Sequence, residues 1–209
     1  MILEAVINAL IYVAVSCAAL IVILILAMLI QYKRARVIAN RLLNEAERDS
    51  SFVYSLLKTA FPSSHILFHT YLTSESGERV PTDMILVDHG GIFVFKIKTF
   101  PGMIDNTSRQ KWTVSNYKGV GTFDNPFEQN RACIDAVNSI VNNANVYDVP
   151  THNVVVFAAK NVSFKIRSEN LVTADKLLST VKDMNRNRFL SSREISAVLN
   201  ALKKSQTRK

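Results

Sequence analysis

Three charged side chains on two neighbouring strand-like segments have types and spacing that suggest chemistry. Asp83 begins one apolar segment, and Lys96 and Lys98 stand near the end of the next, over residues 92–98. Side chains alternate along a strand, so Lys96 and Lys98 share a face. If the two strands pair through the short link at residues 89–91, Asp83 and both lysines converge on one side of a sheet. Such a group would favour a phosphate, but the same residues also suit a solvated sheet face.

The residues around these three follow a recognisable order. Asp83 is followed by Gly91–Lys98, by Phe100 and Gly102, by Trp112, and by Asn125-Pro126 with Gln129. This order resembles the nuclease-related domain (NERD) family over about residues 48–159. That family is similar to the PD-(D/E)xK nucleases, so the resemblance implies an α/β domain in which a mixed sheet is flanked by helices.

The resemblance also implies a site, from which this sequence departs. In such nucleases an Asp is followed, after a variable gap, by Glu-x-Lys, and the two carboxylates hold a divalent cation that activates water and stabilises the phosphate charge. Asp83 matches the first acid, Lys98 matches the lysine, and Gln129 matches a glutamine on the following helix. However, Lys96 stands where the Glu is expected, and Ser50 stands where an acid of the preceding helix is expected.

An ammonium group at position 96 would repel the metal ion. At ~4 Å and an effective dielectric constant near 20, one pair of unit charges is worth about 4 kcal/mol, and the exchange of Glu for Lys reverses the sign of such an interaction. We therefore expect Lys96 to pair with Asp83 in place of a cation, and we expect no metal or small-molecule cofactor. The degenerate site would bind nucleic acid without cutting it, through four basic residues: Lys96, Lys98, Arg109 and Lys111.

Two other functions remain open at this level. The first is an active deoxyribonuclease that uses Mg²⁺ held by Asp83 and a relocated carboxylate from Glu78, Asp88 or Asp105. The second is a structural subunit of a membrane complex, in which the fold is only a scaffold. The sequence contains no Ser/His/Asp or Cys/His set and no Walker loop, which argues against hydrolases and NTPases of those classes.

The N-terminal part of the chain predicts a membrane span. The chain has 209 residues and a formal net charge of +8, yet residues 5–32 carry no charge. The 22 residues Ala9–Ile30, which are almost all apolar, would form a helix of roughly 33 Å, long enough for a ~30 Å hydrocarbon core. Four basic residues follow the span: Lys33, Arg34, Arg36 and Arg41. By the positive-inside rule the N-terminus lies outside and the rest in the cytoplasm.

This topology predicts a single-pass protein of the inner (cytoplasmic) membrane of a bacterium. Because Glu4 is the only charge in residues 1–32, the remainder carries 25 basic and 16 acidic groups, or +9. Such an excess favours polyanionic partners. The expected partners are therefore the lipid bilayer, DNA and, in the structural alternative, other subunits of a membrane complex.

The elements that must position the charged residues form four regions. We expect a transmembrane helix over 1–32, a juxtamembrane helical region over 33–62, the α/β domain over 63–202 and a basic tail over 203–209. Apolar alternation predicts strands over 65–72, 83–87, 92–98, 111–115 and 154–158. Helical spacing predicts helices over 31–57, 126–142, 174–184 and 192–204, with a possible fresh helix start at Asp49-Ser50-Ser51.

Overall fold

The computed structural model describes residues 17, 18, 20–31, 33, 49–187 and 189–207. The chain divides into two compact units, Met1–Arg41 and Leu42–Lys209. In the first unit, residues 20–31 are helical and their side chains are exposed. Much of the predicted span Ala9–Ile30, and all of its basic flank except Lys33, lie outside the described residues. Within the described ranges, no helix combines the length and the apolar character needed to cross a membrane.

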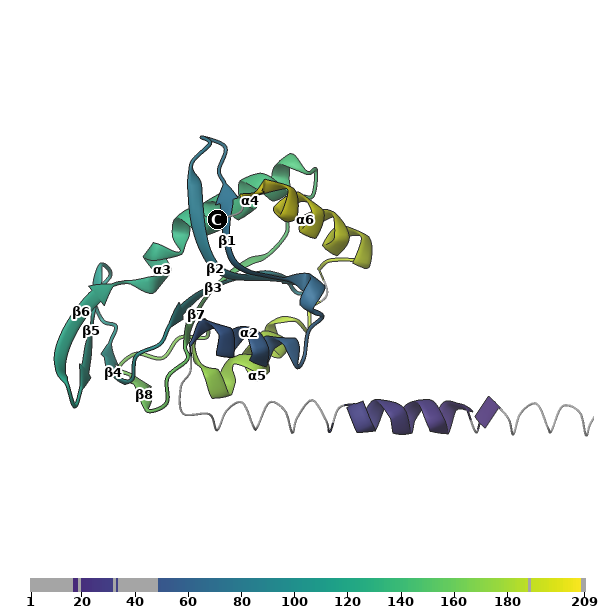
Figure 1. Cartoon of the computed structure of the whole chain (residues 1–209), viewed down its shortest axis with the longest axis horizontal. Coiled ribbons are helices and arrows are strands. Elements are labelled where there is room, and N and C mark those ends of the chain that lie inside the picture. Colours follow the sequence, from purple (N-terminus) through teal and green to yellow (C-terminus); the bar gives the residue numbers. More distant parts are fainter. Residues whose placement is uncertain (1–16, 19, 32, 34–48, 188, 208–209) are drawn as a thin grey trace, which may run out of the picture. The chain divides into compact units, whose positions relative to one another are not determined.

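The second unit is an α/β domain with two mixed sheets (Figure 1). The larger sheet has the strand order β10-β1-β2-β3-β7-β9, and the smaller has the order β6-β5-β4-β8. The strands are β1 (Ile66–Thr73), β2 (Arg79–Asp88), β3 (Gly91–Lys98), β4 (Gly102–Asp105), β5 (Lys111–Asn116), β6 (Gly119–Asp124), β7 (Thr151–Phe157), β8 (Val162–Phe164), β9 (Leu171–Thr173) and β10 (Gln206–Thr207). The helices are α2 (Ser50–Lys58), α3 (Pro126–Gln129), α4 (Arg131–Asn143), α5 (Ala174–Met184) and α6 (Ser192–Ser205), and η1 (Ser63–His65) is a single 3₁₀ turn.

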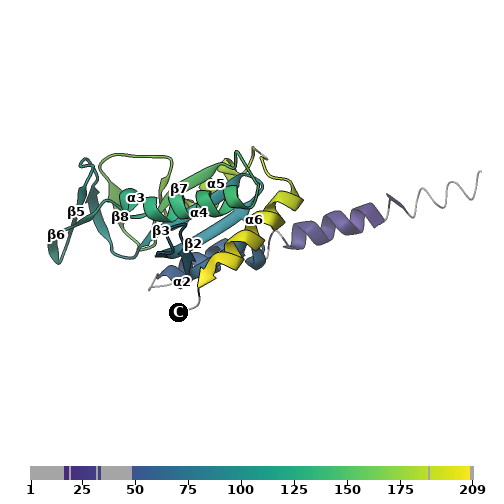
Figure 2. The ribbon, with the colours of Figure 1, turned by 90° about the horizontal axis from the view of Figure 1, so that it is seen from above.

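Helices cover both faces of the larger sheet. In Figure 1, α4 and α6 lie on one side of the strands, and α2 and α5 lie on the other. Figure 2, seen from above, shows α4 and α6 over β2 and β3. Apolar residues at helical spacing on α4 and α6, such as Val137 and Val198, join Ile85 and Val94 of the sheet in one buried cluster. The mixed sheet with flanking helices that the resemblance implies is therefore confirmed.

The smaller sheet was not predicted. Its strands β4, β5 and β6 follow β3, and β8 joins them after β7. Alternation along β4 and β5 buries Ile104 and Trp112, which pack with Phe157 of the larger sheet, while the other face is mostly solvated. Sequence patterns missed β4, β6 and β8 because they are short or rich in glycine and polar residues, which makes the period-2 pattern weak.

Local signals placed most helix ends correctly. Asp49 is the N-cap of α2, and its Oδ1 accepts a hydrogen bond from Phe52 N at 2.9 Å. Ser191 and Glu194 form a capping box at the start of α6. The single helix predicted over 126–142 is wrong. It is divided into α3 and α4 at Asn130, whose side chain is used in a tertiary contact described below.

The hairpin of β1 and β2 has an irregularity that positions Asp83. Val80 and Ile85 of β2 belong to the same buried cluster although they are an odd number of residues apart, so the alternation of faces is interrupted between them. In the paired strand β1, His69 has a φ of +46° near the same level. Pairing of β2 with β3 ends at Met84 and Phe95. Asp83 is thus the first residue of β2 beyond the ladder with β3.

Candidate nucleic-acid interface

Asp83 is held by two donors on β3. Its Oδ1 accepts from Lys96 Nζ at 3.1 Å, and its Oδ2 accepts from the main-chain N–H of Ile97 at 2.9 Å. Where the β2–β3 ladder ends, the Asp83 carboxylate replaces a main-chain carbonyl as the acceptor for the N–H of Ile97. The same carboxylate neutralises the charge of Lys96. About a quarter of each of the two charged side chains is exposed, so water screens this ion pair only in part.

Lys98 is bonded to a neutral partner. It follows Lys96 on the same face of β3, and its Nζ donates to Gln129 Oε1 at 2.8 Å. Gln129 is placed by α3, which begins at Pro126 after Asn125 caps the helix by accepting from Phe127 N at 3.0 Å. The structure therefore brings together the four residues that the sequence proposed for a degenerate site: Asp83, Lys96, Lys98 and Gln129.

Lys98 carries a charge that its surroundings oppose. Its Nζ lies 5.7 Å from the centre of the Phe123 ring. Partial burial lowers the pKa of Lys98 below its usual value of 10.5, and repulsion from Lys96 lowers it further. Asp83 and Asp124 act in the opposite direction. An incoming anion would relieve the repulsion between the two ammonium groups.

Two asparagines that sequence reasoning missed fix the helix behind this group. Asn130 Nδ2 donates to the main-chain oxygen of Val94 at 2.9 Å and to Asn153 Oδ1 at 3.0 Å. Asn153 Nδ2 in turn donates to the main-chain oxygen of Phe127 at 3.0 Å. These bonds tie α3 to β3 and β7. The sequence shows only that an asparagine follows the motif that starts the helix. It does not show that this asparagine is buried, and burial is what requires its amide to find hydrogen-bond partners.

The remaining basic residues of the predicted interface are not part of this group. Arg109 lies before β5, where its main-chain oxygen accepts from Asn125 Nδ2 at 2.8 Å, and Lys111 is the exposed first residue of β5. Within residues 49–187, neither side chain forms a hydrogen bond or ion pair with Asp83 or Gln129. Arg109 contacts the N-cap residue of α3 through its main-chain oxygen, and Lys111 is paired through the backbone with Asp124 of β6.

None of the three acids considered as relocated metal ligands forms a contact with Asp83 among the described residues, because each has another partner or lies elsewhere in the fold. Asp88 lies at the opposite end of β2 and accepts from Asn185 Nδ2 at 2.6 Å. Asp105 is paired with Lys165 at 2.9 Å, which, together with hydrogen bonds from Thr107, lowers the pKa of that carboxyl to about 2. Glu78 lies in the exposed turn between β1 and β2.

Ser50, at the position where a helix acid was expected, belongs to another contact. Its Oγ lies 2.6 Å from His69 Nε2. Asp83 thus has Lys96 beside it in place of a second carboxylate. A carboxylate already neutralised by an ammonium 3.1 Å away does not fit a divalent cation.

The chain belongs to the nuclease-related domain (NERD) family, whose sequence model matches residues 44–158, or 115 of the 209 residues. It is also 28% identical over 91 residues to an uncharacterised protein of Bacillus anthracis. That alignment covers 43% of each protein, so the chain spans less than half the length of this curated relative. No solved structure matches the chain.

Proposed function

We propose that this chain is a membrane-tethered NERD protein that binds nucleic acid without cutting it. The observation that carries the proposal is the 3.1 Å contact between Lys96 and Asp83. In this site the chain supplies its own cation, a lysine ammonium, at the carboxylate that would otherwise help to hold a metal ion. The chemistry that a metal ion supplies, activation of water and stabilisation of the leaving oxygen, is then missing, whereas the attraction for phosphate remains.

The attraction for phosphate arises from Lys98. Lys96 is neutralised by Asp83, but the partner of Lys98 is the neutral amide of Gln129. These four residues alone therefore carry a net charge of +1, which a DNA phosphate would compensate. Asp124 is close enough to act on Lys98 through its charge, but among the described residues it forms no ion pair with this lysine. Arg109 and Lys111 are proposed to contact neighbouring phosphates, and the excess of basic groups outside residues 1–32 adds affinity that does not depend on base sequence.

The tether of this proposal is the apolar segment Ala9–Ile30 with its basic flank. Its composition and length suit a single-pass anchor in the inner membrane of a bacterium, with residues 33–209 in the cytoplasm. The bilayer would then be the first partner of the protein, and DNA close to the membrane would be the second.

The proposal is tested by measuring the binding of single- and double-stranded DNA to the full-length chain in a mild detergent. We expect binding that weakens steeply as salt rises, because each phosphate contact releases condensed counterions. Absence of salt-sensitive binding to either form of DNA would exclude the proposal. A stoichiometric protein partner in a detergent pull-down, together with absent DNA binding, would instead indicate the structural subunit.

A cleavage assay separates the proposal from an active nuclease. We expect no cleavage of DNA by the full-length chain in Mg²⁺ or Mn²⁺, with Asp83→Ala as the control for contaminating nuclease. Cleavage that disappears in Asp83→Ala would establish a metal-dependent nuclease. In that case Asp124 would be the first candidate for the second acid, because it already influences the pKa of Lys98.

A further inference from the structure

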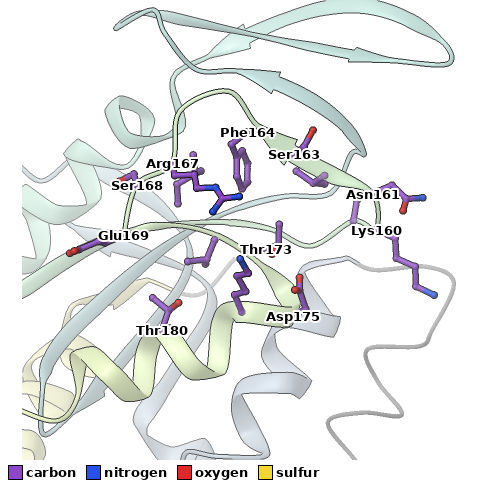
Figure 3. Close-up of a pocket in the computed structure, with 15 residues that line it drawn as sticks. Lys160, Asn161, Ser163, Phe164, Arg167, Ser168, Glu169, Thr173, Asp175 and Thr180 are labelled. Atoms are coloured by element: carbon purple, nitrogen blue, oxygen red, sulfur yellow. The ribbon is translucent and has the colours of Figure 1, made fainter.

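A cavity of about 700 Å³ lies at the carboxyl ends of β7 and β9. It is open to solvent on one side and is bordered by the segment from Ala159 to Glu169 and by the first turns of α5 (Figure 3). In open α/β sheets, ligands bind at the carboxyl ends of parallel strands, and β3, β7 and β9 run parallel here. The Lys98–Gln129 contact is made from α3, so this cavity is distinct from the site described above.

Two cationic side chains that line the cavity, Arg167 and Lys176, suit an anionic ligand. Figure 3 shows the guanidinium group of Arg167 pointing into the space beneath Phe164. Lys176 of α5 also lines the cavity. In the described part of the chain, neither Arg167 nor Lys176 forms an ion pair, whereas nearby Lys165 is paired with Asp105. A guanidinium group and an ammonium group in one concavity suit a phosphate, because Arg binds phosphate with two parallel hydrogen bonds.

The rest of the lining suits a larger ligand than a simple anion. Leu171 and Val172 are each 5% exposed and provide an apolar wall next to Phe164. Glu169 and Asp175 also line the cavity, and neither forms an ion pair within the described residues. Carboxylates next to a phosphate site are unfavourable unless the ligand also brings hydrogen-bond donors, as the hydroxyls of a ribose do.

We propose that this cavity binds a phosphorylated nucleoside. Arg167 and Lys176 would receive the phosphate, Asp175 would accept from the sugar hydroxyls, and the apolar wall would contact the base. The volume lies within the roughly 300–1,000 Å³ that is usual for small-ligand sites. The inference does not rest on DNA binding at Lys98, because it uses other residues, on the segment between β8 and β9 and on α5.

The ligand chemistry has two sources, a free nucleotide and the phosphorylated end of a nucleic-acid strand. Binding of AMP, GMP, CMP and UMP to the full-length chain is measured one at a time by isothermal titration calorimetry, with adenosine and inorganic phosphate as partial ligands. We expect at least one nucleotide to bind about tenfold more tightly than either partial ligand, because each of these lacks half of the contacts. Competition by a 5′-phosphorylated dinucleotide assigns the strand end, and its absence assigns the free nucleotide; both support the site.

A matched pair of variants locates the binding. Arg167→Gln combined with Lys176→Gln is expected to weaken nucleotide binding about tenfold or more, because it removes both cations from the cavity. Lys182→Gln removes an exposed lysine of the same helix that does not line the cavity, and it is expected to leave the affinity unchanged. The proposal is overturned if none of the four nucleotides binds, or if both variants bind like the unaltered chain.

Discussion

Two aspartates of the same strand, Asp83 and Asp88, show how different environments give one residue type different roles. Asp88 lies at the closed end of the β2–β3 hairpin and is 9% exposed. Its carboxylate accepts from Asn185 and lies 3.6 Å from His65 Nδ1. Asp83 lies at the open end, five residues earlier, where its partners are a charged lysine and a main-chain N–H.

The difference lies in what surrounds each carboxylate. At Asp88 the loop after α5 closes over the hairpin, because Asn185 also accepts from Gly90 N, and little room is left for a ligand. At Asp83 the strands separate, and a second lysine, Lys98, stands beside the pair without a neutralising partner of its own. A buried carboxylate with polar partners fastens a turn, whereas the partly exposed carboxylate among lysines belongs to the surface that we propose binds nucleic acid.

The largest effect is expected for Lys96→Glu. It would place two carboxylates where an ion pair now stands: an attraction of about 4 kcal/mol at ~4 Å and an effective dielectric constant near 20 is lost, and a repulsion of similar size replaces it. The free chain should therefore unfold at a lower temperature, and Mg²⁺ should restore much of the loss by binding both carboxylates. Thermal unfolding with and without Mg²⁺ measures both effects.

The control for this variant is Lys118→Glu, which makes the same charge change at an exposed lysine in the turn between β5 and β6. It should lose little stability and gain no response to Mg²⁺. If Lys96→Glu does not respond to Mg²⁺ either, Lys96 does not occupy the place of a metal ligand.

Asp83→Ala is expected to lower the free energy of unfolding by about 2 kcal/mol. It leaves the Lys96 ammonium without its counter-charge and the N–H of Ile97 without an acceptor, and partial exposure keeps the loss moderate. Asp83→Asn retains an acceptor for Ile97 and should lose about half as much. Urea denaturation compares the two, and equal stability of all three proteins would mean that the ion pair contributes nothing.

Lys98→Gln tests whether the lysine beside the Asp83–Lys96 ion pair contributes to DNA binding. We expect the affinity for DNA to fall several-fold and the slope of log affinity against log salt to decrease by about one, because one phosphate contact is lost. Fluorescence anisotropy at several salt concentrations gives both values. Lys182→Gln, on the exposed surface of α5, is the control and should change the DNA affinity and the salt slope less than Lys98→Gln does. If the two variants change both quantities equally, Lys98 has no special role in binding.

Asp88→Asn tests whether the aspartate at the closed end of the β2–β3 hairpin contributes to stability and not to DNA binding. The asparagine can still accept from Asn185, but a neutral amide oxygen accepts a weaker hydrogen bond than a carboxylate does, so we expect a loss of about 1 kcal/mol in stability. DNA binding should not change, because this residue lies at the far end of the strand. A loss of DNA affinity as large as that of Lys98→Gln would remove the distinction between the two aspartates.

The smallest effect is a dependence on alkaline pH. Because the pKa of Lys98 is lowered, this lysine loses its charge as pH rises towards 10.5, before an ordinary lysine does. DNA affinity should therefore begin to weaken in this range, and Lys98→Gln should lack that component. The effect on folding stability has the opposite sign. Burial of the charged Lys98 opposes folding at neutral pH, and this penalty disappears as the pH rises above the pKa that Lys98 has in the unfolded chain.

Several features of the fold and the site could be predicted because they depend on local sequence. The alternation of β3 placed Lys96 and Lys98 on one face, and the two-residue His89-Gly90 turn paired β2 with β3. The caps at Asp49 and Ser191 follow from side chains that bond to backbone within three residues. Such interactions need no knowledge of distant parts of the chain.

Other features depended on contacts between distant segments. The break at Asn130 arises because its amide bonds to Val94 and Asn153, which are 36 and 23 residues away. The smaller sheet needs β8 to return beside β4 after the crossover to β7. The cavity near Arg167 is formed where that returning segment meets α5. None of these leaves a periodic pattern in the sequence.

The sequence by itself determined the family, the apolar N-terminal segment, the basic excess and the presence of lysine where a second carboxylate was expected. Residue identity and local periodicity were sufficient for these conclusions. The tertiary structure alone decided that the carboxylate of Asp83 also accepts from the main-chain N–H of Ile97, that Lys98 has an uncharged partner, and that Asp88 is closed off. Each of these depends on where β2 separates from β3 and on which helix covers the gap, and such distances are set by packing between segments far apart in the chain.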